Sequence, residues 1–125
     1  MDAETRAKKF TELHRELLAT YNLVTGLLER LPIPMLLPRV QGDEPETAIR
    51  SLSRAWELAG LEPLTTLETG RLRAMINAWL TAYEVACMAQ QAGPAAWRIV
   101  AIEEALITVR VSARYIDRHL SEYGR

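Results

Sequence analysis

The stretch ALITVRVSARYIDRHL, residues 105–120, decides the fold because it fits two kinds of secondary structure. From Ile107 to Tyr115 every second residue is apolar or small, as in a half-buried strand, but this alternation covers only nine residues. A heptad pattern with alternating gaps of three and four covers 25 residues, and we therefore predict a helix. The heptad core positions are Ile99, Ile102, Leu106, Val109, Ala113, Ile116, Leu120 and Tyr123.

A helical segment that also alternates must carry apolar residues on a second side. At about 100° per residue, Val100, Ile107, Val111 and Tyr115 lie roughly opposite the heptad core positions. We call these four residues the second stripe. The helix is expected either to pack centrally in the fold or to present this stripe to a second copy or another protein.

An amphipathic helix is predicted for residues 3–31, followed by a proline-rich apolar connector. Asp2 suits the N-cap, and Pro32 ends the helix because proline lacks a backbone N–H. The connector from Pro32 to Pro38 is held out of helix by its prolines, yet it carries four large apolar residues. We expect it to fold back over one end of the bundle as a lid; the alternative is a segment that docks a partner.

Two further helices are predicted between this connector and the heptad segment. One covers residues 45–59, with Pro45 at its first position. The other opens with Thr65 and Glu68, which have the form of a capping box, and ends at Gly93-Pro94. Because that junction is tight, the helices on either side should be antiparallel neighbours. The predicted fold is an all-α, antiparallel four-helix bundle in a single helical domain, residues 1–125.

Composition restricts the class of function. A net charge of -1 and a pI near 6.1 argue against a protein that coats nucleic acid by bulk charge. No apolar run approaches the roughly 18 residues that a membrane span needs, so no membrane association is expected. The single cysteine, Cys87, and the lack of a secretory leader favour a cytoplasmic, reducing compartment.

The sequence contains no recognisable cofactor or metal motif. Glycine-rich phosphate loops are absent, and His14 and His119 are the only histidines, neither of them with Glu three residues before it. We expect no cofactor, no metal ion and no small-molecule substrate. An interaction protein is favoured over an enzyme.

Three arginines form the main candidate nucleic-acid site. Arg110, Arg114 and Arg118 follow at i, i+4 and i+8, which places them on a ridge between the heptad core positions and the second stripe. We interpret them as candidate phosphate contacts, with Tyr115 as a surface on which a base could stack. The alternative is a solvated face, or ion pairs with acids of the second helix.

The hexapeptide from Arg114 to His119 has the form Arg, four residues, His, and it resembles the motif of the HEPN family of helical ribonucleases. The resemblance covers six residues. It implies RNA cleavage without metal by two copies that meet across a dimer. Arg114 would then bind phosphate and His119 would act on the 2′-hydroxyl.

These observations lead to one main hypothesis and two alternatives. The main hypothesis is a non-enzymatic interaction subunit of a larger nucleoprotein assembly, comparable in size and helical format to small subunits of CRISPR effector complexes or components of phage packaging machinery. It would bind a protein partner or itself through the second stripe and would contact nucleic-acid phosphate. The alternatives are a HEPN-type ribonuclease and a phage-encoded protein inhibitor.

Overall fold

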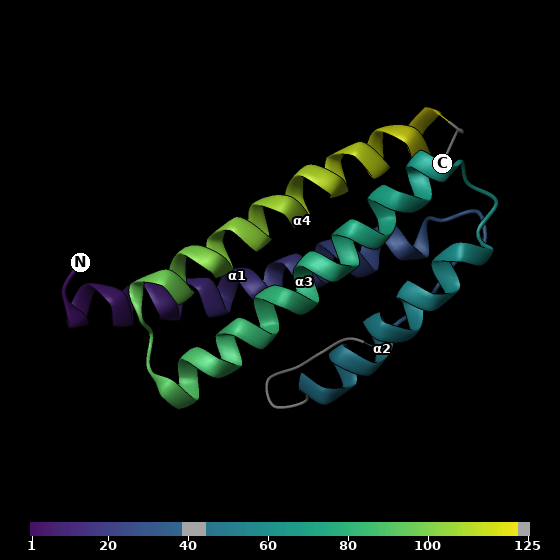
Figure 1. The fold of residues 1–125 in the computed structure, drawn as a ribbon. Helices are drawn as coiled ribbons and strands as arrows, with labels where there is room; N and C mark the ends of the chain where they lie inside the picture. The colour runs from purple at the N-terminus through teal and green to yellow at the C-terminus, as the bar shows by residue number, and fades with distance from the viewer. Residues whose placement is uncertain (39–44, 123–125) are drawn as a thin grey trace.

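The computed structural model describes residues 1–38 and 45–122, and in these residues the chain is all-α (Figure 1). The elements are α1 (Ala3–Glu29), α2 (Pro45–Leu58), the short 3-10 helix η1 (Ala59–Leu61), α3 (Thr66–Ala92) and α4 (Ala96–Glu122). The described residues contain no strand, so the alternating stretch from Ile107 to Tyr115 is helical. The helical bundle predicted from the sequence is confirmed.

The helix ends form as the sequence predicts. Asp2 accepts a hydrogen bond from the backbone N–H of Thr5 at 2.8 Å, which satisfies one of the unpaired donors at the start of α1. Thr65 and Glu68 form a reciprocal capping box at the start of α3. α3 ends at Gly93, whose φ of 105° is open to glycine but rarely to other residues.

The heptad core positions of α4 form one wall of the hydrophobic core. Their side chains are buried against α3 and α1, as predicted, except that Tyr123 lies outside the described residues. The apolar stripe of α1 faces them, and α3 contributes its large residues from the third side. The buried α4 residues are Ile99, Ile102, Leu106, Val109, Ala113, Ile116 and Leu120.

The directions of the helices differ from a simple up-and-down arrangement. Lys9 pairs with Glu103 at 3.3 Å and Glu16 with Arg110 at 3.5 Å, so residue numbers rise together along α1 and α4. These two helices therefore run in the same direction, while α3 runs opposite to both (Figure 1). The antiparallel relationship predicted for α3 and α4 is present. α2 also runs antiparallel to α3 and in the same direction as α1 (Figure 1).

α3 is the central helix of the bundle. It packs against α1, α2 and α4, whereas α4 packs against α3 and α1 (Figure 1). The sequence left open whether α4 itself was central. Ala82, Ala86 and Ala89 are buried on α3 and allow α4 to approach closely. α4 consequently lies at the side of the bundle away from α2.

The connector after α1 is partly covered and partly exposed. Met35 is buried, its N–H donates to the carbonyl of Leu28 at 2.9 Å, and the hydroxyl of Tyr21 donates to the carbonyl of Pro38 at 2.9 Å. By contrast, Leu36 is 82% exposed. The segment closes over the core at Met35 while it leaves part of its apolar surface open beside α2.

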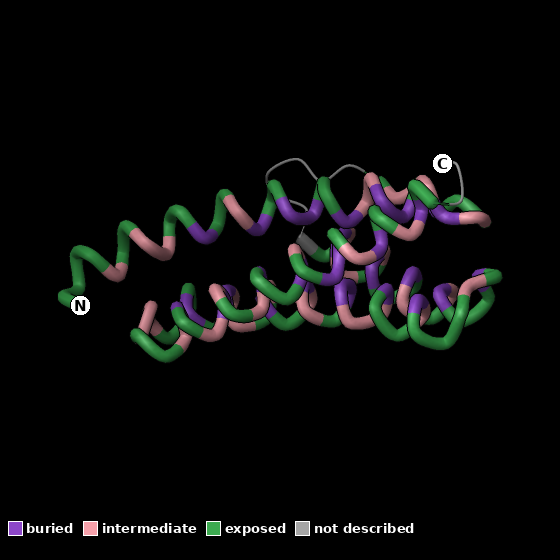
Figure 2. Tube along the Cα trace, turned by 90° about the horizontal axis from the view of Figure 1, so that it is seen from above, coloured by how far each residue is buried: buried purple, intermediate pink, exposed green. Residues whose placement is uncertain are grey.

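Burial is uneven along α1. Its N-terminal turns carry exposed and half-buried residues, and the first buried side chain is Leu13 (Figure 2). Beyond that residue one side of the helix is buried. The N-terminal end of α1 therefore contributes little to the core.

Candidate functional site

The outer face of α4 carries exposed apolar side chains from the second stripe. Val100, Ile107 and Val111 are 45%, 56% and 55% exposed. In the part of the chain that the structure describes, α4 packs only on α3 and α1, and neither helix covers these three residues. Trp97, one turn before Val100, is 65% exposed and extends the same apolar surface.

Tyr115, the fourth residue of the second stripe, lies at the border between this face and the core. Its ring is half-buried, packs against core residues and stacks on the ring of His119 at 4.1 Å between centroids. The guanidinium of Arg71 on α3 lies 5.5 Å from the ring centroid. Both ring contacts are already made within the chain, which leaves less of Tyr115 available for stacking a base.

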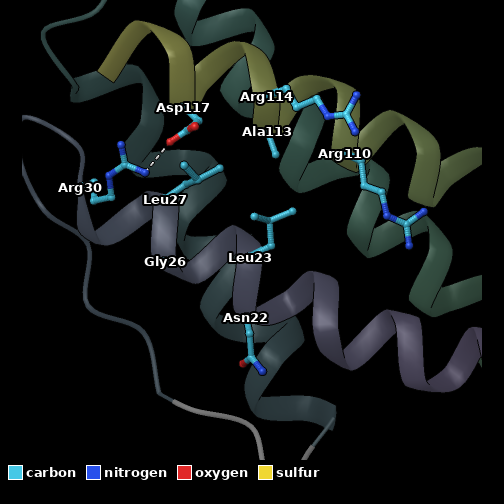
Figure 3. Close-up of a pocket in the computed structure, with 9 residues that line it drawn as sticks. All are labelled: Asn22, Leu23, Gly26, Leu27, Arg30, Arg110, Ala113, Arg114 and Asp117. Atoms are coloured by element: carbon cyan, nitrogen blue, oxygen red, sulfur yellow. Dashed lines mark hydrogen bonds and ion pairs between the residues drawn. The ribbon is translucent and has the colours of Figure 1, made fainter. Parts of the chain in front are cut away.

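The candidate phosphate-binding arginines border a groove between α1 and α4 (Figure 3). Arg110 and Arg114 lie along the α4 edge of the groove. Leu23 and Leu27 come from α1 and point toward α4. Gly26 adds no side chain, so the groove stays open there. Arg118 lies one turn farther along α4 and does not line the groove.

Ion pairs use some of the positive charge around this groove. Arg30, which directly follows α1, donates to Asp117 of α4 at 2.6 Å and closes one end of the groove (Figure 3). Arg110 pairs with Glu16 of α1 at 3.5 Å, and not with an acid of the second helix as one alternative expected. Arg114 and Arg118 are exposed and form no ion pair with any described residue. These two guanidinium groups are the ones available to a phosphate.

The two residues of the HEPN-like motif point to different sides of α4. Five positions separate Arg114 from His119, which corresponds to a rotation of about 140° around the helix axis. Arg114 lies on the groove, while His119 is half-buried, with its Nδ1 2.9 Å from the carbonyl oxygen of Tyr115. Within one chain the two side chains therefore do not converge on a shared point.

The described residues contain no cluster of three or more His, Cys, Asp or Glu side chains that could hold a metal ion. Cys87 is half-buried beside Tyr83 on α3. Burial raises the pKa of Tyr83 to about 12, with smaller contributions from Cys87 and from the negative charge of Glu46. A phenol held neutral in this way is a packing group.

A second exposed apolar surface lies between the connector and α2. Ile33, Leu36 and Leu61 are 55%, 82% and 73% exposed along a shallow groove. Glu62 lies at its edge, buried, and accepts a hydrogen bond from the N–H of Ile33 at 2.9 Å. A partner-docking connector was one of the two alternatives from the sequence, but the sequence gave no signal for the part that Leu61 plays in this groove.

Sequence reasoning also missed Trp97 and Arg30. Trp97 precedes the first heptad core position, and only the structure shows that its ring continues the outer face. Arg30 follows the C-terminus of α1, and its pairing with Asp117 depends on α1 and α4 running in the same direction. A local pattern carries no information about that direction.

Comparison with known proteins gives no relative for the chain: no family model, no curated protein and no solved structure matches it. Among the described helices, none combines the length and the apolar character required to cross a membrane.

Proposed function

We propose that this chain is a non-enzymatic interaction subunit that binds protein through the outer face of α4. The observation that carries the proposal is the exposure of Val100, Ile107 and Val111 in line on a helix whose opposite face is fully buried. A row of large apolar side chains on an otherwise well-packed bundle is typical of a contact surface. Trp97 adds an aromatic side chain of the kind that often dominates binding energy.

The second part of the proposal is contact with nucleic-acid phosphate, as expected for a subunit of a nucleoprotein assembly. Arg114 and Arg118 support it, because their guanidinium groups are exposed and have no ion-pair partner among the described residues. Arginine presents a planar set of donors that matches phosphate oxygens. The acidic pI limits this contact to a local one.

A photo-crosslinking amino acid at position 111 tests the protein-binding part in cells that express the chain. The matched control is the same group at position 67, because Leu67 on α3 is equally apolar and 59% exposed, against 55% for Val111. We expect covalent complexes from position 111, with a second copy or with a different protein, and few from position 67. Equal or absent crosslinking at the two positions would overturn the proposed surface.

Fluorescence anisotropy with labelled RNA and DNA oligonucleotides at low salt tests the phosphate contact. Arg114→Ala with Arg118→Ala should weaken binding for all sequences and lower the salt dependence by roughly two counterions. Arg50→Ala with Arg54→Ala on α2 removes the same charge from another exposed surface and serves as the control. If both pairs weaken binding equally, the contact is non-specific charge attraction and the arginine site is wrong.

A further inference from the structure

The outer face of α4 carries a second heptad series that extends beyond the second stripe. Its members follow at alternating gaps of three and four, the spacing that forms the seam of a two-helix coiled coil. The first heptad series is used inside the bundle, while this one has no partner helix in the described part of the chain. We call it the outer seam; it consists of Trp97, Val100, Glu104, Ile107, Val111, Arg114 and Arg118.

Charge is sorted along the outer seam. Glu104 lies on the N-terminal side of Ile107 and Val111, and Arg114 lies on their C-terminal side. Neither Glu104 nor Arg114 has an ion-pair partner among the described side chains, and both are exposed. A helix with an acid before its apolar centre and a base after it is complementary to a second copy that runs in the opposite direction, because each acid then faces a base.

The direction of pairing follows from this order of charges. In a parallel pair each seam residue would face its own equivalent, so Arg114 would face Arg114 and Glu104 would face Glu104, which is repulsive. In an antiparallel pair with its two-fold axis level with position 109, Ile107 faces Val111 of the second copy. Glu104 then faces Arg114 of the second copy, and symmetry produces each contact twice.

We infer that the occupant of the α4 outer face is a second copy of this chain, joined antiparallel along the outer seam. This inference rests on the proposed function, since it identifies the partner of the same surface. The position of α4 at the side of the bundle leaves its outer face open along its length (Figure 1). The centre of the contact is formed by Ile107 and Val111 from both copies, flanked by the two Glu104–Arg114 pairs.

The contact is a small one. In this register Val100 faces Arg118 of the second copy, so only the central layers of Ile107 and Val111 are well suited to exclude water. The dimer therefore belongs to the weak, transient class of interfaces. It forms and separates with protein concentration, so Arg114 pairs with Glu104 in the dimer and is open to phosphate in the monomer. Sedimentation equilibrium over a wide concentration range is the suitable measurement, and circular dichroism checks that every variant keeps its helical fold.

Charge reversal tests both the occupant and the register. Glu104→Arg alone places two arginines opposite each other, and Arg114→Glu alone places two glutamates opposite each other, so each should weaken dimerisation at least about tenfold. The double variant Glu104→Arg with Arg114→Glu restores both opposite-charge pairs and should restore the dimer. In a parallel arrangement the double variant would still juxtapose like charges. Glu84→Arg and Arg54→Glu reverse exposed charges elsewhere and should leave dimerisation unchanged.

Three results would overturn the inference. The first is a wild-type chain that stays monomeric up to near-millimolar concentration; crosslinking from position 111 to a different protein would then keep the proposed function and exclude the second copy. The second is a dimer that survives Ile107→Glu with Val111→Glu, which would place self-association on another face. The third is a double charge reversal that fails to restore a dimer weakened by the single reversals.

Discussion

Trp79 of α3 donates its indole N–H to the backbone carbonyl oxygen of Leu17 in α1 at 3.0 Å, and both side chains are buried in the core. This bond ties the central helix to the helix that lies parallel to α4. The ring of Trp79 also packs against Tyr21 of α1, with 5.3 Å between centroids. The side chain of Trp79 therefore fixes both how closely α1 and α3 pack and how the two helices are aligned along their length.

Replacing Trp79 tests how much of this contact is the hydrogen bond. Trp79→Phe keeps an aromatic ring but removes the donor, and we expect a loss of about 1–3 kcal/mol in the free energy of unfolding. Trp79→Ala also leaves a cavity and should cost about 3–5 kcal/mol. Urea unfolding of the two variants gives both values. Equal losses would mean that the ring beyond its N–H contributes nothing to the core.

Two adjacent residues of α4 distinguish its buried face from its outer face. Leu106 is fully buried, whereas Ile107 is 56% exposed. Leu106→Ala should lower the free energy of unfolding by about 2–5 kcal/mol. Ile107→Ala, measured at a concentration where the chain is monomeric, should change it by no more than about 0.5 kcal/mol. Comparable losses in thermal or urea unfolding would show that the outer face is packed within the monomer.

The sequence predicted the local features of this fold because they depend on neighbouring residues. The cap at Asp2, the capping box of Thr65 and Glu68 and the buried heptad series of α4 all follow from residues within a few turns of one another. The common direction of α1 and α4 did not follow, because no local pattern says in which direction one helix runs relative to another. The central position of α3 depends in turn on packing between helices that are far apart in sequence.

The sequence also predicted only part of the candidate site. Helical periodicity placed Val100, Ile107 and Val111 opposite the heptad core positions, and all three are exposed. Periodicity could not place Tyr115, because its burial depends on Arg71 and the neighbouring surface of α3. The sequence could not predict the pairing of Arg110 with Glu16 either, because aligning an acid of α1 with α4 requires the directions of both helices.

Two glycines, one within α3 and one just after it, provide opposite tests of backbone conformation. Gly93 has a φ of 105°, a region that L residues rarely adopt, so Gly93→Ala should destabilise the protein by about 1–3 kcal/mol. Gly70 lies within the helix, and a methyl group added there would meet no atom within 4 Å. Gly70→Ala should therefore stabilise by about 0.5–1 kcal/mol through its better helix propensity. Calorimetric melting of both variants checks the two signs; a stabilising Gly93→Ala would contradict the positive φ of Gly93 at the end of α3.

The raised pKa values of two tyrosines predict how the free energy of unfolding changes at high pH. Burial raises the pKa of Tyr83 to about 12 and also raises the pKa of Tyr21, whereas an unfolded tyrosine titrates near 10. The unfolded chain therefore loses these protons first. The stabilising contribution is complete below pH about 10 and is lost as the pH rises toward about 12.

A spectroscopic titration of the tyrosinate absorbance checks this order. We expect the folded chain to show a late phase near the raised pKa of Tyr83, and we expect Tyr83→Phe to lack it. Urea unfolding at neutral pH and again just above pH 10 should show that wild-type stability falls more steeply than that of Tyr83→Phe, since the variant has no proton to lose at this position. A single ionisation phase near pH 10 for all tyrosines of a chain that is still helical would contradict the burial of Tyr83.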